Sequence, residues 1–179
     1  PTLRPSIPAS QATATATPSL ATAAPGPPPD LFTPPSQPLR TARLLVTNDA
    51  LWAGHPASRT VSRLSLPDGR RLWQTHVGCE PATLGRSSPR LFAACFDTGE
   101  LLVIQEDTGE LLTRKRVGHG PFGVLAASDR LFVTLAHESA LLSLHLDSLT
   151  EISRASTAAQ PRGMALKDRR LFVVHNLDS

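Results

Sequence analysis

Arg90-Leu91-Phe92 returns as Arg130-Leu131-Phe132 and again as Arg170-Leu171-Phe172, at intervals of 40 residues. A proline recurs with the same period, at Pro81, Pro121 and Pro161. Two independent markers in one phase indicate a tandem array, in which a single supersecondary unit of about forty residues is repeated. This repeat decides the fold class before any single residue is considered.

Each unit is predicted to contain short strands that are closed by turns. In the second unit, an apolar run at Leu101-Leu102-Val103-Ile104 is followed by Asp107-Thr108-Gly109-Glu110 and by a second run at Leu111-Leu112-Thr113. Aspartate favours turns and glycine accepts a positive φ, so this segment is predicted to be a hairpin. A proline-containing loop and another short apolar run follow each hairpin. Because no segment keeps a helical period, we predict an all-β protein with four strands in each unit.

A four-stranded antiparallel unit of this length is typical of a β-propeller blade. We predict blades at residues 43–85, 86–126 and 127–167, and the start of a fourth at 168–179. The first blade is taken to hold seven extra residues, since Arg43 and Arg90 are 47 positions apart. Closed propellers usually have about four to eight blades, so the propeller is predicted to be incomplete in this chain. It is either part of a longer protein or a half-propeller that closes by dimerisation.

The first 42 residues differ in composition from the rest of the chain. They hold eleven of the 17 prolines, and Ala, Thr and Ser supply most of the remainder. Such a segment cannot bury enough apolar surface to offset chain entropy, so residues 1–42 are predicted to be a disordered tether. An inert linker, a lipoprotein-like tether to a membrane or cell wall, and a glycosylated stalk all fit this composition. The chain starts with Pro1 rather than Met, so we expect a removed N-terminal leader or a longer product.

Short motifs within the units follow one further pattern. Leu45-Val46-Thr47-Asn48 is echoed by Phe132-Val133-Thr134 and Phe172-Val173-Val174, and Val117-Gly118-His119-Gly120-Pro121 leads into Phe122-Gly123-Val124-Leu125-Ala126. These segments resemble the YVTN-type bacterial β-propeller repeat proteins, which are WD40-like. The resemblance covers residues 43–179 and departs from the pattern at Phe92-Ala93-Ala94-Cys95. It implies a propeller that serves as a binding scaffold, as a cofactor-bearing enzyme or as a module beside a haem domain.

The two cysteines, Cys79 and Cys95, lie symmetrically about residue 87. That residue is the middle of a turn predicted over Arg86-Ser87-Ser88-Pro89, so the cysteines are expected to be cross-strand neighbours. A disulfide between them is predicted if the protein is exported, and two separate thiols are the alternative. No Cys-x-x-Cys or His-x-x-x-His spacing is present in the sequence, so no metal site is predicted.

The repeat also places several histidines on one face of the blades. The proline-containing loops and the loops after the Arg-Leu-Phe strands are expected on the same face, where propeller ligands usually bind. His119 shares a repeat position with Cys79, and His175 shares another with Cys95. The ligand-face candidates are therefore His55, His119, His137 and His175. Loop histidines without a function, and a shared metal or haem ligand role for His119 and His137, are the alternatives.

The sequence contains no common catalytic motif, so no catalytic residue is predicted. The carboxylates of Asp68, Asp107 and Asp147 are assigned to turn formation. Only 4% of the residues are aromatic and the net charge is +3, which argues against single-stranded nucleic-acid binding. No apolar stretch reaches the roughly 18 residues of a membrane helix, so no transmembrane segment is predicted.

These observations favour a non-catalytic, extracytoplasmic β-propeller module without a cofactor. Its predicted location is the periplasm or the cell surface. Its predicted partner is a protein, a peptide or a cell-envelope component. The alternative is the propeller part of a periplasmic oxidoreductase, fused to a c-type cytochrome or peroxidase-like domain outside this segment, and only then is haem expected.

Overall fold

The computed structural model describes residues 39–40 and 43–176 of the 179-residue chain. Every regular element in this part is a β-strand, and every pairing between strands is antiparallel. Within the same residues, no helix has the length and apolar character needed to cross a membrane. The prediction of an all-β protein is confirmed.

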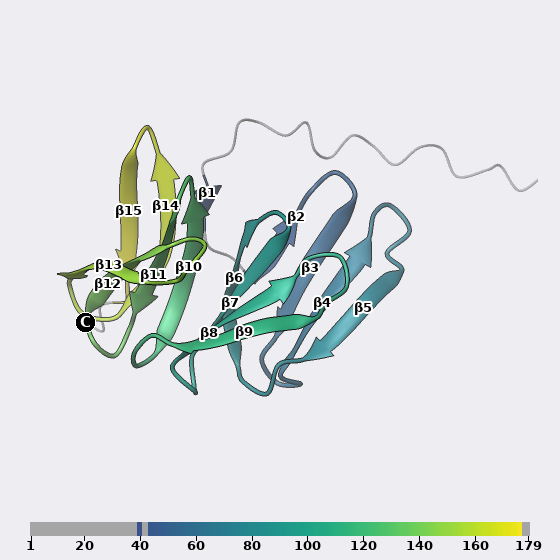
Figure 1. The fold of residues 1–179 in the computed structure, drawn as a ribbon, viewed down its shortest axis with the longest axis horizontal. Helices are drawn as coiled ribbons and strands as arrows, with labels where there is room; N and C mark the ends of the chain where they lie inside the picture. The colour runs from purple at the N-terminus through teal and green to yellow at the C-terminus, as the bar shows by residue number, and fades with distance from the viewer. Residues whose placement is uncertain (1–38, 41–42, 177–179) are drawn as a thin grey trace, which may run out of the picture. The chain divides into compact units, whose positions relative to one another are not determined.

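The strands form three four-stranded sheets and one three-stranded sheet (Figure 1). The first sheet contains β2 (Leu44–Val46), β3 (Ala50–His55), β4 (Thr60–Ser65) and β5 (Arg71–His76). The second contains β6 (Pro81–Ser87), β7 (Arg90–Cys95), β8 (Glu100–Gln105) and β9 (Leu111–Arg116). The third contains β10 (Pro121–Ala127), β11 (Arg130–Leu135), β12 (Ala140–His145) and β13 (Glu151–Ser156). The last contains β14 (Pro161–Lys167) between β15 (Arg170–His175) and β1 (Leu39–Arg40).

The repeat is stricter than the sequence motifs indicate. The second strands of the four sheets, β3, β7, β11 and β15, begin at Ala50, Arg90, Arg130 and Arg170, at constant intervals of 40 residues. The prediction of seven extra residues in the first unit is therefore wrong. The counterpart of Arg-Leu-Phe in that unit is Ala50-Leu51-Trp52. Trp52 is fully buried, as Phe92 is, so a large aromatic fills the same core position although the motif is not conserved between the units.

The blade boundaries also differ from the predicted ranges. The predicted boundary between residues 126 and 127 places β10 and β11 in different blades. In the structure the two strands belong to one sheet, with Val124 paired to Val133 and with Ser128 and Asp129 as their connection. A two-residue connection joins neighbouring antiparallel strands, so the second, third and fourth blades each start one strand earlier than predicted. The blades span residues 44–76, 81–116, 121–156 and 161–175.

Two other expectations do not match the strand positions. Leu45 and Val46 lie in the first strand of their sheet, whereas Phe132-Val133-Thr134 lies in the second strand of the third sheet. The two segments are not equivalent, and the YVTN repeat type remains a prediction. β1 lies inside the range predicted as a tether, but its backbone pairs with an edge of β14. These two residues therefore belong to the last sheet. The rest of that tether lies outside the described residues.

In each blade the first strand is the innermost and the last strand is the outermost. The first strand of the third blade, β10, packs between the first strands β6 and β14. The last strands, β5, β9 and β13, are mostly exposed. One apolar core joins the first and second blades through Trp52, Leu84 and Ile104. Another joins the second and third blades through residues that include Phe92 and Val124. Each blade is thus held mainly by the faces that it shares with its neighbours.

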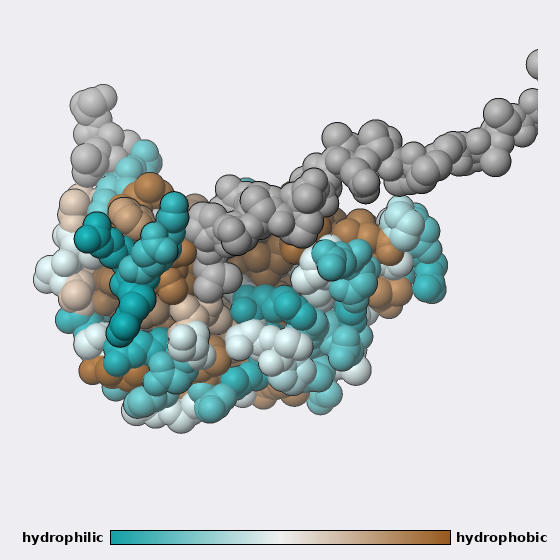
Figure 2. Space-filling model, turned by 90° about the horizontal axis from the view of Figure 1, so that it is seen from above, coloured by the Kyte–Doolittle hydropathy of each residue, from teal (hydrophilic) through white to brown (hydrophobic). Residues whose placement is uncertain are grey.

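The strands have two distinguishable ends. The turn end holds the short connections between first and second strands and lies uppermost in Figure 1. The loop end, at the opposite end of the strands, holds the connections that lead from one blade to the next. Figure 2 views the turn end and shows hydrophilic and hydrophobic residues intermixed there.

The four sheets do not close into a ring. The outward face of the first sheet leaves Leu44 and Val46 exposed by 55% and 59%. The outward face of the last sheet leaves Phe172 and Val174 exposed by 54% and 63%. In the interior blades, Phe92, Ala94 and Thr134 at the equivalent positions are buried, and Phe132 is half-buried. The prediction of an incomplete propeller is therefore confirmed.

Candidate functional site

The connections at the loop end are tied to one another by backbone hydrogen bonds. The Phe96 amide donates to the Glu80 carbonyl at 3.1 Å, and the Ala136 amide donates to the Gly120 carbonyl at 2.8 Å. The repeat positions therefore bring the proline-containing loops and the loops after the second strands to the same end. Candidate ligand residues on these loops are close enough to act together.

Two of the four candidate histidines meet at this end. His119 and His137 line a cavity of about 300 Å³, together with Glu80, Phe96 and Arg116. His55 lies apart, with its Nε2 2.8 Å from the Ser62 hydroxyl oxygen in the first sheet. His175 ends β15, is half-buried and does not line the cavity.

The two histidines in the cavity have separate partners. The His119 Nδ1 lies 3.5 Å from Glu138 Oε1, and the other oxygen of that carboxylate is 2.5 Å from Arg154 Nη1. The His137 ring packs edge-on against Phe96, with 4.9 Å between ring centres. Among the described residues, no three His, Cys, Asp or Glu side chains are arranged to hold a metal ion. A shared metal-ligand role of the two imidazoles therefore finds no third protein ligand among these residues.

Cys79 and Cys95 also lie at the loop end. Their Cα atoms are 5.5 Å apart and the structure joins their sulfur atoms in a disulfide. Both side chains are fully buried in the core between the first and second blades. The strand register centres the hairpin on Ser88 and Pro89 rather than on residue 87, because Ser87 pairs with Arg90. The register pairs Cys95 with Pro81, and Cys79 lies two residues before β6, yet the Cα atoms of the two cysteines are within disulfide distance.

Each inner strand carries a β-bulge where it starts at the loop end. The register shifts lie between Pro81 and Thr83 in β6, between Pro121 and Val124 in β10, and between Pro161 and Met164 in β14. A bulge frees a residue from strand pairing and re-aims its side chain, and bulges are common beside binding sites. The three residues that directly follow the repeated prolines are Ala82, Phe122 and Arg162.

The backbone at these three positions is held by side chains of the preceding blade. Arg43 Nε donates to the Ala82 carbonyl at 3.2 Å, and the Thr83 hydroxyl donates to the Phe122 carbonyl at 2.5 Å. The Thr134 hydroxyl donates to the Arg162 carbonyl at 2.7 Å. Each of the three carbonyls thus accepts a hydrogen bond from a side chain of the preceding blade, although the donors differ.

Phe122 and Arg162 complete a cluster of aromatic rings and a guanidinium group. The Arg162 guanidinium lies over the Phe122 ring at 4.7 Å and over the Phe96 ring at 5.5 Å from their centres. The two rings meet edge to face at 6.2 Å. The cluster lines a second cavity, of about 190 Å³, whose other lining residues include Arg43, Pro56 and Glu80. Glu80 and Phe96 line both cavities, and we call the two cavities together the loop-end cleft.

Charges in the loop-end cleft are unevenly paired. Arg59, which does not line the cleft, lies 3.8 Å from the Glu80 carboxylate and 3.3 Å from that of Asp97. The two guanidinium groups of Arg116 and Arg162 lie within the cleft, and neither forms an ion pair with a carboxylate of the described residues. The cleft therefore offers a positive charge beside an aromatic surface.

Sequence reasoning did not single out Phe96, Phe122 or Arg162. The repeat contains a signal for two of these residues, since Phe122 and Arg162 share a repeat position with Ala82. Phe122 and Arg162 are only half-buried, so the core does not fix the identity of their side chains. Variation within a strict repeat could have marked them.

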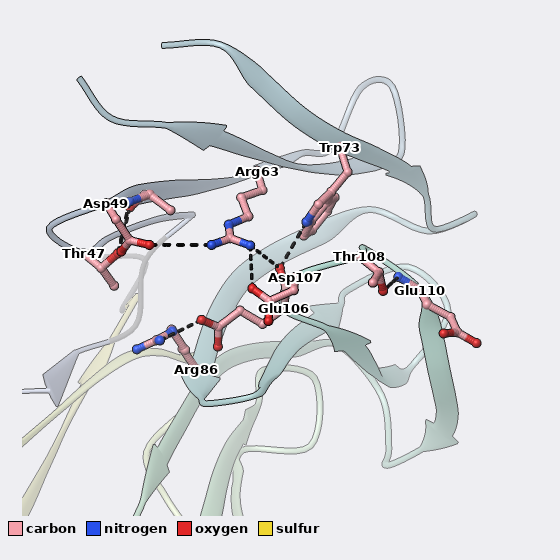
Figure 3. Close-up of polar contacts among 10 residues, drawn as sticks. Thr47, Asp49, Arg63, Trp73, Arg86, Glu106, Asp107, Thr108 and Glu110 are labelled. Carbon is pink, nitrogen blue, oxygen red and sulfur yellow. Dashed lines mark hydrogen bonds and ion pairs between the residues drawn. The ribbon is translucent and has the colours of Figure 1, made fainter. Parts of the chain in front are cut away.

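A second polar cluster lies at the turn end, between the first and second blades (Figure 3). The guanidinium groups of Arg63 and Arg86 lie over the Trp52 ring at 5.2 and 5.3 Å from its centre. Arg86 pairs with the buried carboxylate of Glu106 at 2.7 Å, and Arg63 pairs with Asp107 at 2.7 Å. The contacts of Arg63 with Asp107 and of Arg86 with Trp52 connect adjacent blades, so we assign the cluster to the joint between the blades.

The same cluster perturbs one exposed carboxyl group. A hydrogen bond from the Thr47 hydroxyl, and to a smaller extent the positive charge of Arg63, lower the pKa of Asp49 below its usual value. The lowered pKa follows from these contacts on the solvated rim of the joint. It marks no catalytic group.

No protein-family model matches this chain, and no curated protein matches it. Solved structures are similar to it in fold. BamB from Moraxella catarrhalis is 17% identical, with a TM-score of 0.63 over 74% of this chain and 39% of that chain. The RRP9 WD40 repeats are 12% identical, with a TM-score of 0.61 over 76% of this chain and 51% of that chain. Glutaminyl cyclase from Myxococcus xanthus is 13% identical, with a TM-score of 0.61 over 75% and 61%.

These similarities concern the fold. The chain spans about two fifths to three fifths of the length of the three solved chains, at sequence identities of 12–17%. One of them is named as a WD40 repeat array and another as an enzyme, so the shared fold does not select a function. The described chain is thus an array of WD40-like β-propeller blades that does not close into a ring.

Proposed function

We propose that this chain belongs to an extracytoplasmic, non-catalytic propeller module that binds a protein or peptide of the cell envelope through the loop-end cleft. The main support is the set of three repeat-equivalent positions, Ala82, Phe122 and Arg162. The carbonyl of each accepts a hydrogen bond from a side chain of the preceding blade, and their own side chains differ. A rigid scaffold that presents variable side chains at one end is suited to recognition.

The contacts within the cleft favour binding over catalysis. His119 contacts the Glu138 carboxylate, and His137 packs on Phe96. Activation of a nucleophile needs an imidazole within hydrogen-bond reach of a hydroxyl or thiol. The contacts of these two histidines instead position loops and rings.

The proposed location outside the cytoplasm is supported by the cysteine pair. Cys79 and Cys95 are buried beside the cleft at a Cα separation of 5.5 Å, which suits a disulfide. Structural disulfides persist in oxidising compartments and are rare in the cytosol. We therefore expect the bond to form during export and to fix the loop that carries Glu80.

Site-specific crosslinking in the native organism tests both parts of the proposal. A photoreactive phenylalanine analogue replaces His119, whose side chain is 69% exposed at the cleft. In the control it replaces His145, which is exposed near the turn end. The cleft position is expected to crosslink to a discrete envelope protein or peptide, and the control position is not.

The same cells report the compartment of the protein. The chain is expected in the extracytoplasmic fraction, with both cysteines protected from thiol alkylation until a reductant is added. Equal crosslinking from both positions would refute the cleft as the binding surface. Free thiols on a cytoplasmic chain would refute the proposed location.

A further inference from the structure

The placement of Arg162 indicates what kind of group the cleft binds. Its guanidinium carbon lies 4.7 Å from the centre of the Phe122 ring and 5.5 Å from that of the Phe96 ring. One terminal nitrogen donates to Gln160 Oε1 at 3.1 Å. Arg162 lines the smaller of the two cavities, and its guanidinium has further N–H donors besides this one. A guanidinium edge binds a carboxylate through two parallel hydrogen bonds.

Neighbouring cations strengthen this preference. Arg43 lines the same cavity, where its Nε is committed to the Ala82 carbonyl at 3.2 Å. Arg116 lines the adjoining cavity. Since the carboxylates of Glu80 and Asp97 have Arg59 as an ion-pair partner, they leave this positive charge largely unbalanced. An anionic ligand is therefore favoured.

Glu80 decides between two classes of anionic ligand. It lines both cavities, and its side chain is 49% exposed with its nearest cation 3.8 Å away. A nucleic acid would bring successive phosphates against this carboxylate, which repels them. A peptide carries isolated carboxylates and many backbone N–H donors, so it can satisfy Arg162 and Glu80 at the same time.

The size and lining of the cleft also suit a peptide. Its cavities of about 190 and 300 Å³ meet at Phe96 and Glu80. Each can take one or two side chains of an extended segment, and the Phe96 and Phe122 rings supply an apolar contact next to the cationic edge. The site thus pairs one charged contact with one apolar contact.

We propose that the loop-end cleft binds an acidic peptide segment, in which an Asp or Glu carboxylate pairs with Arg162 and an adjacent apolar side chain packs on Phe96 and Phe122. This inference rests on the proposed binding function and specifies its ligand. No covalent step is involved. The interaction depends on the planar guanidinium and its stacked position as well as on the positive charge.

Selection of peptides by the full chain tests the proposal. Random peptides displayed on phage are selected on immobilised protein, and the recovered peptides are measured by fluorescence anisotropy beside versions in which Glu or Asp is replaced by Gln or Asn. We expect the recovered peptides to share an acidic residue next to an apolar one. Their affinity is expected to fall about tenfold or more in R162Q, in R162K and with the amide versions.

A matched variant separates the stacked cation from bulk charge. R130Q removes the same charge near the turn end, where Arg130 is exposed, and is expected to bind the peptides as the unaltered chain does. Melting curves show that each variant is folded. Equal losses in R130Q and R162Q, or equal binding of acidic and amide peptides, would overturn the proposal. Preferential binding of an oligothymidylate in the cleft would overturn it as well.

The same selection distinguishes this proposal from the one on which it rests. Peptides that lack an acidic residue but lose affinity in F122A would refute the acidic ligand and leave the cleft as a peptide-binding site. Failure to recover any peptide whose binding depends on Phe122 or Arg162 would count against both.

Discussion

At the scale of single residues, the buried carboxylate of Glu106 needs an ion-pair partner to offset its loss of water. It is 6% exposed and pairs with Arg86 at 2.7 Å. Glu106→Gln removes the charge but keeps the size of the side chain. We expect the free energy of unfolding to fall by about 1–3 kcal/mol, because a hydrogen bond between charged groups is replaced by a weaker one.

Urea denaturation of Glu110→Gln provides the matched control. Glu110 is exposed in the same connection, and its amide rather than its side chain is hydrogen-bonded. A change within about 0.5 kcal/mol is expected there, as for most surface substitutions. If both variants lose equal stability, the buried pair does not hold the joint between the first and second blades.

The disulfide between Cys79 and Cys95 gives a second prediction at this scale. It closes a loop of 16 residues, and the chain-entropy relation gives about 3 kcal/mol for a loop of this size. Reduction of the full chain should lower the free energy of unfolding by about that amount. The double variant Cys79→Ala, Cys95→Ala should resemble the reduced chain and should not respond to a reductant. A response to reductant in that variant would contradict a role for the bond.

Some residues of the site were predictable and others were not, for a physical reason. The proximity of Cys79 and Cys95 was predicted from their symmetry about a turn, although the strand register pairs Cys95 with Pro81. The convergence of His119 and His137 follows from the common end of their loops. Phe122 and Arg162 lie at bulges, where the alternation of side chains across a strand is interrupted. No pattern in a single sequence reports the direction of such a side chain.

At the scale of elements, the bulge of β10 depends on a glycine. A Cβ atom at Gly123 would lie 2.4 Å from the Arg162 carbonyl oxygen and 2.9 Å from the Thr134 hydroxyl oxygen. Gly123→Ala therefore forces β10 and β14 apart. We expect a loss of about 1–3 kcal/mol in unfolding free energy, typical of overpacking, together with a weaker affinity for ligands of the cleft.

Gly54→Ala is the control for this substitution. Gly54 lies in β3, and its added Cβ would meet Pro81 at an ordinary contact distance of 3.4 Å. Its unfolding free energy should change by less than about 1 kcal/mol, or rise slightly because the unfolded chain loses freedom. Equal destabilisation of the two variants would show that the bulge tolerates a side chain.

Strand position within a blade predicts local stability. The outer strands β5, β9 and β13 are mostly exposed, whereas β6 and β7 are almost entirely buried. Opening an outer strand exposes little apolar surface, so its amides should exchange with solvent at lower free-energy cost. Hydrogen–deuterium exchange should therefore label β9 before β7. Uniform protection across the second blade would contradict this order.

The strands themselves were largely predictable because each unit repeats the same pattern of apolar residues. β7, β11 and β15 share Arg-Leu-Phe, and their common register follows from it. The first unit escaped prediction because Trp52 fills the core position of Phe92 with a different aromatic. The assignment of strands to sheets was wrong for another reason. The 40-residue period alone does not show which strand is the first of a sheet. The two-residue connection between β10 and β11 shows that these strands belong to the same sheet.

At the scale of the whole molecule, the exposed face of the first sheet and the exposed face of the last sheet carry the residues that pack together between neighbouring blades. Phe172 is the repeat equivalent of Trp52 and Phe92, and Leu44 is the equivalent of Leu84 and Val124. Trp52 and Leu84 share the core between the first and second blades. Phe92 and Val124 share the core between the second and third blades. A face with Phe172 should therefore fit a face with Leu44 in the same way.

This equivalence predicts head-to-tail self-association of the 179-residue chain. Sedimentation velocity should show dimers or larger species that grow with concentration, since burying Phe172 and Val174 against Leu44 and Val46 removes exposed apolar surface from water. The variant F172S/V174S and the variant L44S/V46S should each associate less with themselves. When the two variants are mixed, they should form one joint between the two intact faces and so recover dimers.

The variant L112S is the control. It alters a 46% exposed leucine on the outer strand β9 and should leave association unchanged. Because a non-specific apolar attraction would respond to L112S and would not recover on mixing, those two results would reject the repeat-matched joint.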